Sequence, residues 1–350
     1  MHMADALISP AVGGTMWAAA MGLTGYCSTK IKKELDDRKI PLMGVAGAFI
    51  FAAQMLNFTI PGTGSSGHLG GGLILAVLLG PHAAFLAMAS VLTVQALFFA
   101  DGGLLALGCN IINLGFFSCF VAYPLIFKPI AGPSPTRSRL ITASLLAAVV
   151  GLQFGAFGVV LETLASGVSE LPFGTFVFLM QPIHLAIGVV EGLATTAVVL
   201  FVWKARPEVL AITVPSAPAS NRSFRVVLAT LAVATLLAGG TLSWFASTRP
   251  DGLEWSMSRT SGKEELNSPA DRVHPWLSGL QQKTAFLPDY GFKSPPGKDE
   301  AKGEEAEAWP AVDAGTSLSG LVGSALVLLV AALIGFVLRH RRSAARTDRP

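Results

Sequence analysis

Long apolar runs separated by short polar segments dominate this chain. Residues 41–67, 69–100 and 102–127 contain no Asp, Glu, Lys or Arg. Each run is long enough to cross a hydrocarbon core of about 30 Å, or to form a tight pair of crossings. Because the runs lack strand-like alternation and lipid offers the backbone no hydrogen-bond partners, the crossings are expected to be helices. The pattern predicts an all-α membrane protein, a polytopic helical bundle.

We predict nine crossings, seven in an N-terminal bundle and two in a C-terminal unit. They lie at 6–28, 40–59, 68–82, 83–100, 103–127, 140–163, 173–203, 224–246 and 317–338. The expected domains are a seven-helix membrane domain (1–206), a cytoplasmic linker (207–223), a helix–segment–helix unit (224–338) and a basic tail (339–350). The segment between the last two crossings, 247–316, is polar, and its charged run 298–307 is typical of disordered chain.

Basic residues orient the predicted bundle. Lys and Arg concentrate in the segments 29–39, 128–139, 204–223 and 339–350, whereas the loops 60–67, 101–102 and 164–172 contain none. The positive-inside rule therefore places the first four segments in the cytoplasm and the N-terminus outside. Apolar residues make up 52% of the chain and charged residues 13%, a balance that cannot cover a soluble surface. We expect a multi-pass protein of the bacterial inner (cell) membrane.

The N-terminus carries the most specific candidate chemistry. A histidine at position 2 can chelate a divalent metal through the amine of Met1, the backbone nitrogen of His2 and the His2 imidazole Nδ1. His68, which follows the Gly/Ser-rich turn 61–67, can supply a fourth nitrogen. Four nitrogens in a plane suit Ni(II) or Cu(II) better than tetrahedral Zn(II) or oxygen-seeking Mg(II).

Several separated motifs resemble the CbiM/NikM family, the substrate-specific (S) components of nickel and cobalt energy-coupling factor (ECF) transporters. They are the start MHMADALISP, the stretch GHLGGG at 67–72 with LGP at 79–81, and QALFFADGG at 95–103 followed by LGCN at 107–110. This likeness covers residues 1–205. The C-terminal unit, with RPDGLE at 249–254 and LPDYGF at 287–292, resembles the NikN/CbiN type (PDGLE) auxiliary component.

The resemblance implies a ligand set, a cargo and partners. It implies that Met1, His2 and His68 bind the transported Ni²⁺ or Co²⁺, with no organic cofactor. It also implies a transmembrane coupling (T) subunit and cytoplasmic ATPase (A) subunits, and no nucleic acid. The chain has no GxxxxGK[ST] phosphate loop, so it is expected to be a transporter subunit within the lipid bilayer rather than an enzyme.

Several other polar residues allow both a functional and a structural interpretation. Thr63, Ser65 and Ser66 can hydrogen-bond the second nitrogen of His68, or simply form the turn. Asp101, Asn110 and Asn113 can flank a loop that covers the ion, or cap helices. His184 and Glu191 share one face of a crossing, where ionisable groups are costly; we assign them a conformational or partner-contact role. His274 is expected to be solvated or interfacial.

Two alternatives remain open. Co²⁺ uptake for cobalamin synthesis uses the same residues as Ni²⁺ uptake. An intramembrane metalloenzyme would need an open coordination site and a nearby base; HExxH is absent from the sequence, and no carboxylate is expected beside His68. The C-terminal unit is expected to serve metal loading or uptake rather than ligation.

Overall fold

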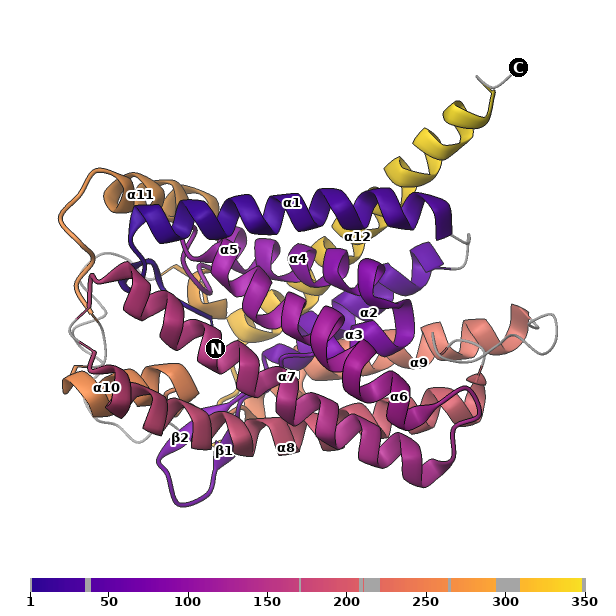
Figure 1. Ribbon diagram of the computed structural model, residues 1–350, viewed down its shortest axis with the longest axis horizontal. Coiled ribbons are helices and arrows are strands. Elements are labelled where there is room, and N and C mark those ends of the chain that lie inside the picture. Colours follow the sequence, from indigo (N-terminus) through magenta and orange to yellow (C-terminus); the bar gives the residue numbers. More distant parts are fainter. Residues whose placement is uncertain are drawn as a thin grey trace.

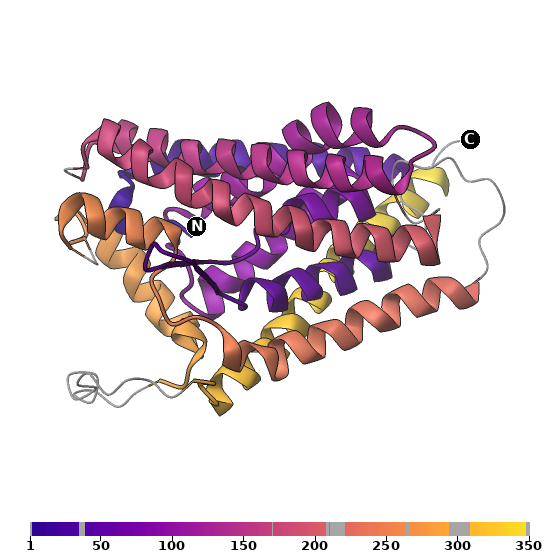
Figure 2. The same cartoon turned by 90° about the horizontal axis from the view of Figure 1, so that it is seen from below.

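Helices that run along the long axis of the molecule make up most of the computed structural model (Figures 1 and 2). It describes residues 2–34, 39–169, 171–207, 210, 221–263, 266–293 and 309–347. The long helices are α1 (Pro10–Glu34), α2 (Lys39–Gln54), α4 (Pro81–Phe98), α7 (Arg137–Ser166), α8 (Phe173–Ala205), α9 (Asn221–Gly240) and α12 (Ala314–Thr347). A further continuous helix comprises α5 (Leu107–Asn110), the π-helical η2 (Ile111–Phe127) and α6 (Lys128–Ala131).

Five of the described helices are long and apolar enough to cross a membrane. They are α4, the α5–η2–α6 helix, α7, α8 and residues Ala314–Arg339 of α12. Large apolar side chains on these helices point outward, among them Phe178, Leu193 and Leu329, as expected for surfaces that contact lipid tails. The chain is therefore a multi-pass helical membrane protein.

The C-terminal helices pack directly on the N-terminal bundle. α12 lies along α2 and α9, while α7 lies along α8. A Cβ on Gly323 of α12 would come within 2.0 Å of the Phe51 ring of α2. Ser324 of α12 donates a hydrogen bond to the carbonyl oxygen of Ala48 (3.3 Å). The two predicted units thus share one interface within the described part of the chain.

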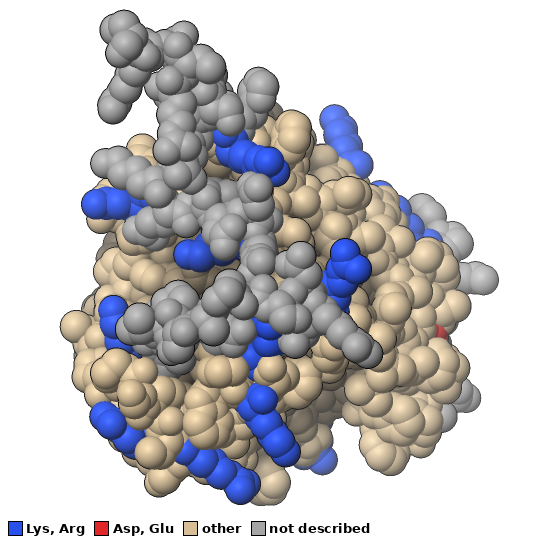
Figure 3. All heavy atoms as spheres, turned by 90° about the vertical axis from the view of Figure 1, so that its right-hand side faces the viewer, with Lys and Arg blue, Asp and Glu red and all other residues tan. Residues whose placement is uncertain are grey.

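One end of the molecule is basic. Figure 3 shows Lys and Arg side chains gathered on the end where α1, α8 and α12 finish and α2, α7 and α9 begin. The described residues of these termini and of α6 include Lys30, Lys39, Lys128, Arg137, Arg139, Lys204, Arg206, Arg225 and Arg339. The opposite end holds the β-hairpin and the short helices α10 (Gly252–Ser261) and α11 (Val273–Thr284).

The helix predicted at 68–82 is wrong in its first part. Only α3 (Gly72–Leu79) is helical; residues 68–71 are irregular. Gly71 has φ +77°, and a Cβ there would lie 2.6 Å from Ile50. An eight-residue helix spans about 12 Å, so α3 alone is too short to cross a membrane, and residues 68–71 add irregular backbone to the predicted crossing. Such backbone is tolerated at membrane depth only where protein satisfies its polar groups.

Glu191 satisfies the irregular backbone. Its carboxylate accepts hydrogen bonds from the N–H groups of Gly70 (2.6 Å) and Gly71 (3.0 Å). The Gln54 side-chain amide donates to the Gly70 carbonyl (2.8 Å). Glu191 is 2% exposed, so its replacement would leave two buried donors without an acceptor.

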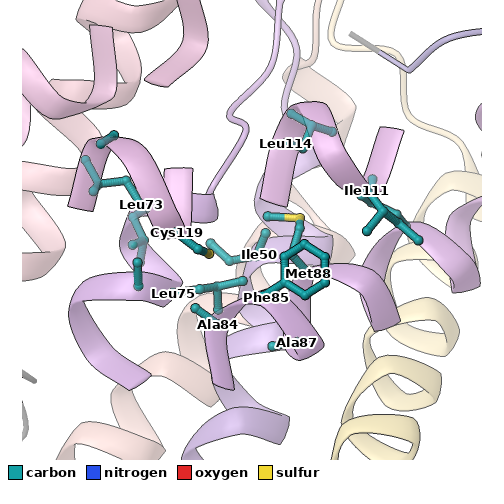
Figure 4. Packing of buried hydrophobic residues seen from close by; sticks show 14 of the residues in the cluster. Ile50, Leu73, Leu75, Ala84, Phe85, Ala87, Met88, Ile111, Leu114 and Cys119 are labelled. Atoms are coloured by element: carbon teal, nitrogen blue, oxygen red, sulfur yellow. The ribbon is translucent and has the colours of Figure 1, made fainter. Parts of the chain in front are cut away.

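Tight apolar packing surrounds this half-helix. Ile50 of α2, Leu73 of α3, Phe85 and Met88 of α4 and Leu114 of η2 belong to one buried cluster (Figure 4). Gly115 allows the Phe85 ring to approach η2, because a Cβ there would lie 3.1 Å from the ring. The irregular segment is therefore anchored in a close-packed core.

Several other boundaries differ from expectation. Residues 339–347 of the predicted basic tail are helical, because α12 continues to Thr347. The segment 247–316 contains α10, α11, the 3₁₀ turn η5 (Pro288–Tyr290) and the first residues of α12, while its charged run 298–307 lies outside the described residues. Most of the predicted linker 207–223 also lies outside them, and α9 begins at Asn221.

We predict a graded response at Glu191. Glu191→Ala should destabilise the protein by roughly 2–5 kcal/mol, because each unsatisfied buried N–H costs about 1–3 kcal/mol. Glu191→Gln keeps one acceptor oxygen and should cost less. Unfolding in detergent would measure both, with Val190→Ala on the exposed face of α8 as control. Equal stability of Glu191→Ala and Val190→Ala would contradict this role.

Candidate metal site

The segment after the N-terminus is held on both sides by buried hydrogen bonds. The Met3 N–H donates to Asn110 Oδ1 (2.8 Å), and the Asn110 side chain donates back to the Met3 carbonyl (3.3 Å). The Gly103 N–H donates to the same carbonyl (2.9 Å). Asp5, which opens the 3₁₀ turn η1 (Asp5–Leu7), accepts from the Ala106 N–H (3.0 Å). These contacts fix the backbone beside His2.

A short hairpin presents the second histidine. Strands β1 (Phe58–Ile60) and β2 (Ser65–Gly67) pair antiparallel, with Phe58 opposite Gly67, and His68 follows β2 directly. A Cβ on Gly67 would lie 2.5 Å from the side chain of Ile187 in α8. The hairpin end can therefore pack against α8 only with glycine at this position.

The structure brings the two predicted imidazoles together. The rings of His2 and His68 are stacked, with centroids 5.1 Å apart and an interplanar angle of 4°. Asp101 Oδ1 lies 3.1 Å from His2 Nδ1. The Tyr290 hydroxyl donates a short hydrogen bond to Asp101 Oδ2. Although burial acts in the opposite direction, His2 and Tyr290 hold the pKa of Asp101 below its usual range.

His68 is in a form suited to metal binding. Its Nδ1 lies 3.1 Å from the Leu69 carbonyl oxygen, which can only accept, so Nδ1 carries the proton and Nε2 keeps its lone pair. The ring is buried, and burial disfavours its charged form. The imidazole is consequently neutral at physiological pH, as metal ligation requires.

The arrangement of His2 differs from the predicted chelate. The chelate uses Nδ1, but Nδ1 faces Asp101, and Nε2 has no hydrogen-bond partner among the described residues. Chelation would therefore require the ring to turn about its Cβ–Cγ bond. Met1 lies outside the described residues. Within them, no three His, Cys, Asp or Glu side chains are grouped to hold a metal, so a site built on these two rings needs backbone or amine nitrogens.

The PDGLE motif forms the outer wall of the site. Asp251 caps α10 in a capping box with Glu254, and its Oδ2 lies 3.9 Å from His68 Nε2. The expectation that no carboxylate stands beside His68 is therefore wrong. The spacing Asp-x-x-Glu signals the cap in the sequence, but nothing in the spacing places it against a loop far away in the chain.

Hydrogen bonds join this motif to the hairpin. The Ser66 N–H donates to the Pro250 carbonyl (2.8 Å), and the Ser66 hydroxyl donates to the Arg249 carbonyl (2.7 Å). The indole of Trp255 donates to the Thr63 carbonyl (3.0 Å). The hydroxyls of Thr63 and Ser65 bond to the Ile60 and Ser66 carbonyls, so these side chains shape the turn and its docking.

The remaining predicted residues lie around the site. Asn113 donates to Glu162 of α7 (2.7 Å) rather than to the loop. His184 donates from Nδ1 to the Met180 carbonyl (2.8 Å) and lines the same small cavity as His68 and Asp251. Tyr290 and Asp251 are the neighbours that sequence reasoning missed, because both come from the C-terminal unit.

A larger cavity connects to the site from the outer side. It has a volume of about 430 Å³ and lies between the N-terminal segment and α10 and α11. His2 and the carboxylate-bearing Asp5, Asp101, Asp251, Glu254 and Asp289 line it, with no Lys or Arg among its described lining residues. This lining favours a cation over an anion.

The fold is that of a multi-pass helical membrane protein, and two family comparisons identify its class. The model described as the cobalt uptake substrate-specific transmembrane region (CbiM) matches residues 2–209, and the PDGLE domain model matches residues 225–340. The chain belongs to the CbiM/NikM family, with a NikN-like PDGLE segment fused at its C-terminal side. The chain is thus a member of a family of metal transport proteins.

Named relatives share much of the chain. A protein of Archaeoglobus fulgidus that carries the name of a fused nickel transport protein NikMN is 31% identical, covering 98% of this chain and 100% of its own. The fused nickel transport protein NikMN of Rhodobacter capsulatus is 31% identical over 78% of this chain and 79% of its own. A solved structure described as a truncated transition metal transporter aligns with a TM-score of 0.52 at 28% identity, covering 58% of this chain and 99% of its own.

We predict that the negative charge of Asp101 favours metal binding. Asp101→Asn removes a carboxylate charge beside His2, so the Ni(II) affinity should fall by roughly tenfold. Titration calorimetry of the purified full-length protein would measure the affinity. Asp313→Asn, an exposed cap at the start of α12, is the matched control. Equal affinities for the two variants would contradict this contribution of Asp101.

Proposed function

We propose that this chain is the substrate-binding component of an ECF-type transporter that imports Ni(II) in ATP-driven uptake, with Co(II) as the alternative cargo. The observation that carries this proposal is the meeting of the His2 and His68 rings at the end of the bundle opposite the basic end. The N-terminus then lies outside the bacterial inner membrane, and the basic end lies in the cytoplasm.

The proposed ligands are the Met1 amine, the His2 backbone nitrogen, His2 Nδ1 and His68 Nε2. The neutral, Nδ1-protonated His68 supports this assignment, because Nε2 then carries no proton and can donate its lone pair to a metal. A hydrated ion would enter through the acidic cavity under α10 and α11, lose water, and turn the His2 ring away from Asp101. Asp251 would then face the bound ion from outside and balance part of its charge.

The energy source lies in other subunits under this proposal. The sequence contains no phosphate loop, so a transmembrane coupling subunit and cytoplasmic ATPases are required. The nickel transport relatives named above favour this function over a metalloenzyme. The carboxylate of Asp251 beside His68 does not change that preference, because it is already engaged as the cap of α10.

We predict that metal binding depends on an unextended N-terminus. One added residue converts the Met1 amine into a peptide nitrogen and moves the original histidine to position three, so Ni(II) affinity should fall by at least about tenfold. His68→Ala should lower affinity similarly while the protein remains folded. A tag after Thr347, away from the site, is the control. Undiminished Ni(II) binding by both variants would rule out this ligand set.

We predict that uptake needs partners. Proteoliposomes with this chain alone should bind radioactive nickel without accumulating it. Adding the coupling subunit and ATPases should give accumulation that requires ATP, and the His68→Ala variant should abolish it. Accumulation by the chain alone, or equal accumulation without ATP, would contradict an ECF mechanism.

A further inference from the structure

His274 joins the C-terminal unit to the metal-binding end of the chain. It is the second residue of α11 and is 2% exposed, so the expectation of a solvated or interfacial histidine is wrong. Its Nε2 lies 3.1 Å from the Asp5 carbonyl oxygen and 3.0 Å from the Ile8 carbonyl oxygen. Both carbonyls belong to the turn that follows His2.

The opposite nitrogen of the ring also faces an acceptor. His274 Nδ1 lies 2.7 Å from Asp271 Oδ2. The other oxygen of Asp271 accepts from the backbone N–H groups of Val273 (2.8 Å) and His274 (2.9 Å), which fixes the carboxylate at the start of α11. A neutral imidazole has one N–H, but this environment offers acceptors to both nitrogens. The geometry therefore favours the doubly protonated, positively charged ring.

The groups around the ring also favour the charged form of His274. Burial by itself disfavours the imidazolium, but the bonds to Asp271, Ile8 and Asp5 raise the pKa of His274 above its ordinary value. The titratable groups that act on the ring are Asp271 at the start of its own helix and Asp5 in the N-terminal segment. Bonds from a charged donor are shorter and stronger than neutral ones.

A second side chain of α11, Gln281, also bonds this helix to the N-terminal bundle. Gln281 of α11 donates to the carbonyls of Ala96 (2.9 Å) and Gly102 (2.8 Å), which flank Asp101. α11 thus contacts both the loop that carries Asp101 and the segment that carries His2. Chain termini are mobile unless they are tied down, and a chelating terminus loses affinity when it is mobile.

We propose that His274 is a positioning residue that holds the N-terminal metal-binding segment in place from the C-terminal unit. It touches no metal; it fixes the carbonyls of residues 5 and 8 and so restricts the backbone that carries His2. This inference rests on the proposed function only in assigning the metal to that segment. The PDGLE unit then contributes to metal retention as well as to loading.

Hydrogen exchange on the metal-free, full-length protein tests whether His274 restrains the N-terminal segment. His274→Ala should accelerate amide exchange in residues 3–8 by roughly tenfold or more relative to the wild type. Gln282→Ala, an exposed position on α11, is the control and should leave it unchanged. His274→Gln, which keeps an N–H for the carbonyls, should give an intermediate effect and serves if His274→Ala does not fold. Unchanged exchange in the His274 variants would overturn the proposal.

Nickel dissociation tests the consequence for binding. His274→Ala should release Ni(II) roughly tenfold faster than the wild type while its melting temperature stays close to that of Gln282→Ala. Asp271→Asn keeps the helix cap and offers Nδ1 a donor, so a neutral His274 can still donate to the carbonyls and retention should be near that of the wild type. Faster exchange without faster release would overturn the positioning role. If neither the wild type nor any variant binds Ni(II), the proposed function is wrong. The exchange measurement still tests whether His274 restrains the N-terminal segment.

The pH dependence provides a separate readout. The folded-state pKa of His274 is raised. The stabilisation from the hydrogen bonds of the charged ring is therefore fully present at pH values below the ordinary imidazole pKa of about 6.5. It is lost as the pH rises through the raised pKa. The ratio of exchange rates between His274→Ala and wild type should therefore shrink toward high pH. A ratio that grows with pH would overturn the assignment of a charged ring.

Discussion

The fixation of the N-terminal segment is the constraint on which the candidate site depends. Segments near a terminus are poorly ordered unless tertiary contacts tie them down. Here Asn110 bonds both the N–H and the carbonyl of Met3, and Asp5 bonds the loop at Ala106. With Met3 fixed, His2 has a defined position against His68 and Asp101. Without these bonds, a two-ring site at the end of the chain would not be preorganised.

The irregular segment before α3 also supports the candidate site. His68 lies at the start of this irregular backbone, and the three glycines after it allow the chain to turn into α3. Glu191 and Gln54 supply the hydrogen bonds that lipid cannot. Burying polar side chains such as Glu191 and Gln54 in a membrane costs free energy. Here they stabilise the backbone that follows His68, a candidate ligand. The PDGLE motif completes the wall from the outer side through Asp251 and Trp255.

The sequence predicted the class of fold and part of the site. Apolar runs and the distribution of basic residues indicate a multi-pass helical bundle, because length and charge act locally. The pairing of His2 with His68 follows from ligand chemistry and from the family resemblance, and the structure places the two rings side by side. The exact number of crossings and the orientation of the N-terminus stay predictions.

The rest depends on contacts between distant parts of the chain. Hydropathy could not show that 68–71 is extended, since those residues are as compatible with a helix as their neighbours. Asp251, Tyr290 and His274 lie in a polar segment, where histidines and carboxylates are usually solvated. Only docking of that segment on the N-terminal turn makes them neighbours of the site. Local patterns carry no information about such docking.

X-ray absorption spectroscopy at the nickel edge of the loaded, untagged protein tests the central claim most directly. A chelate of amine, backbone nitrogen and two imidazoles predicts four nitrogen ligands in a plane, with the spectral signature of square-planar Ni(II). A six-coordinate, oxygen-rich environment, or a tetrahedral one, would contradict the proposed site.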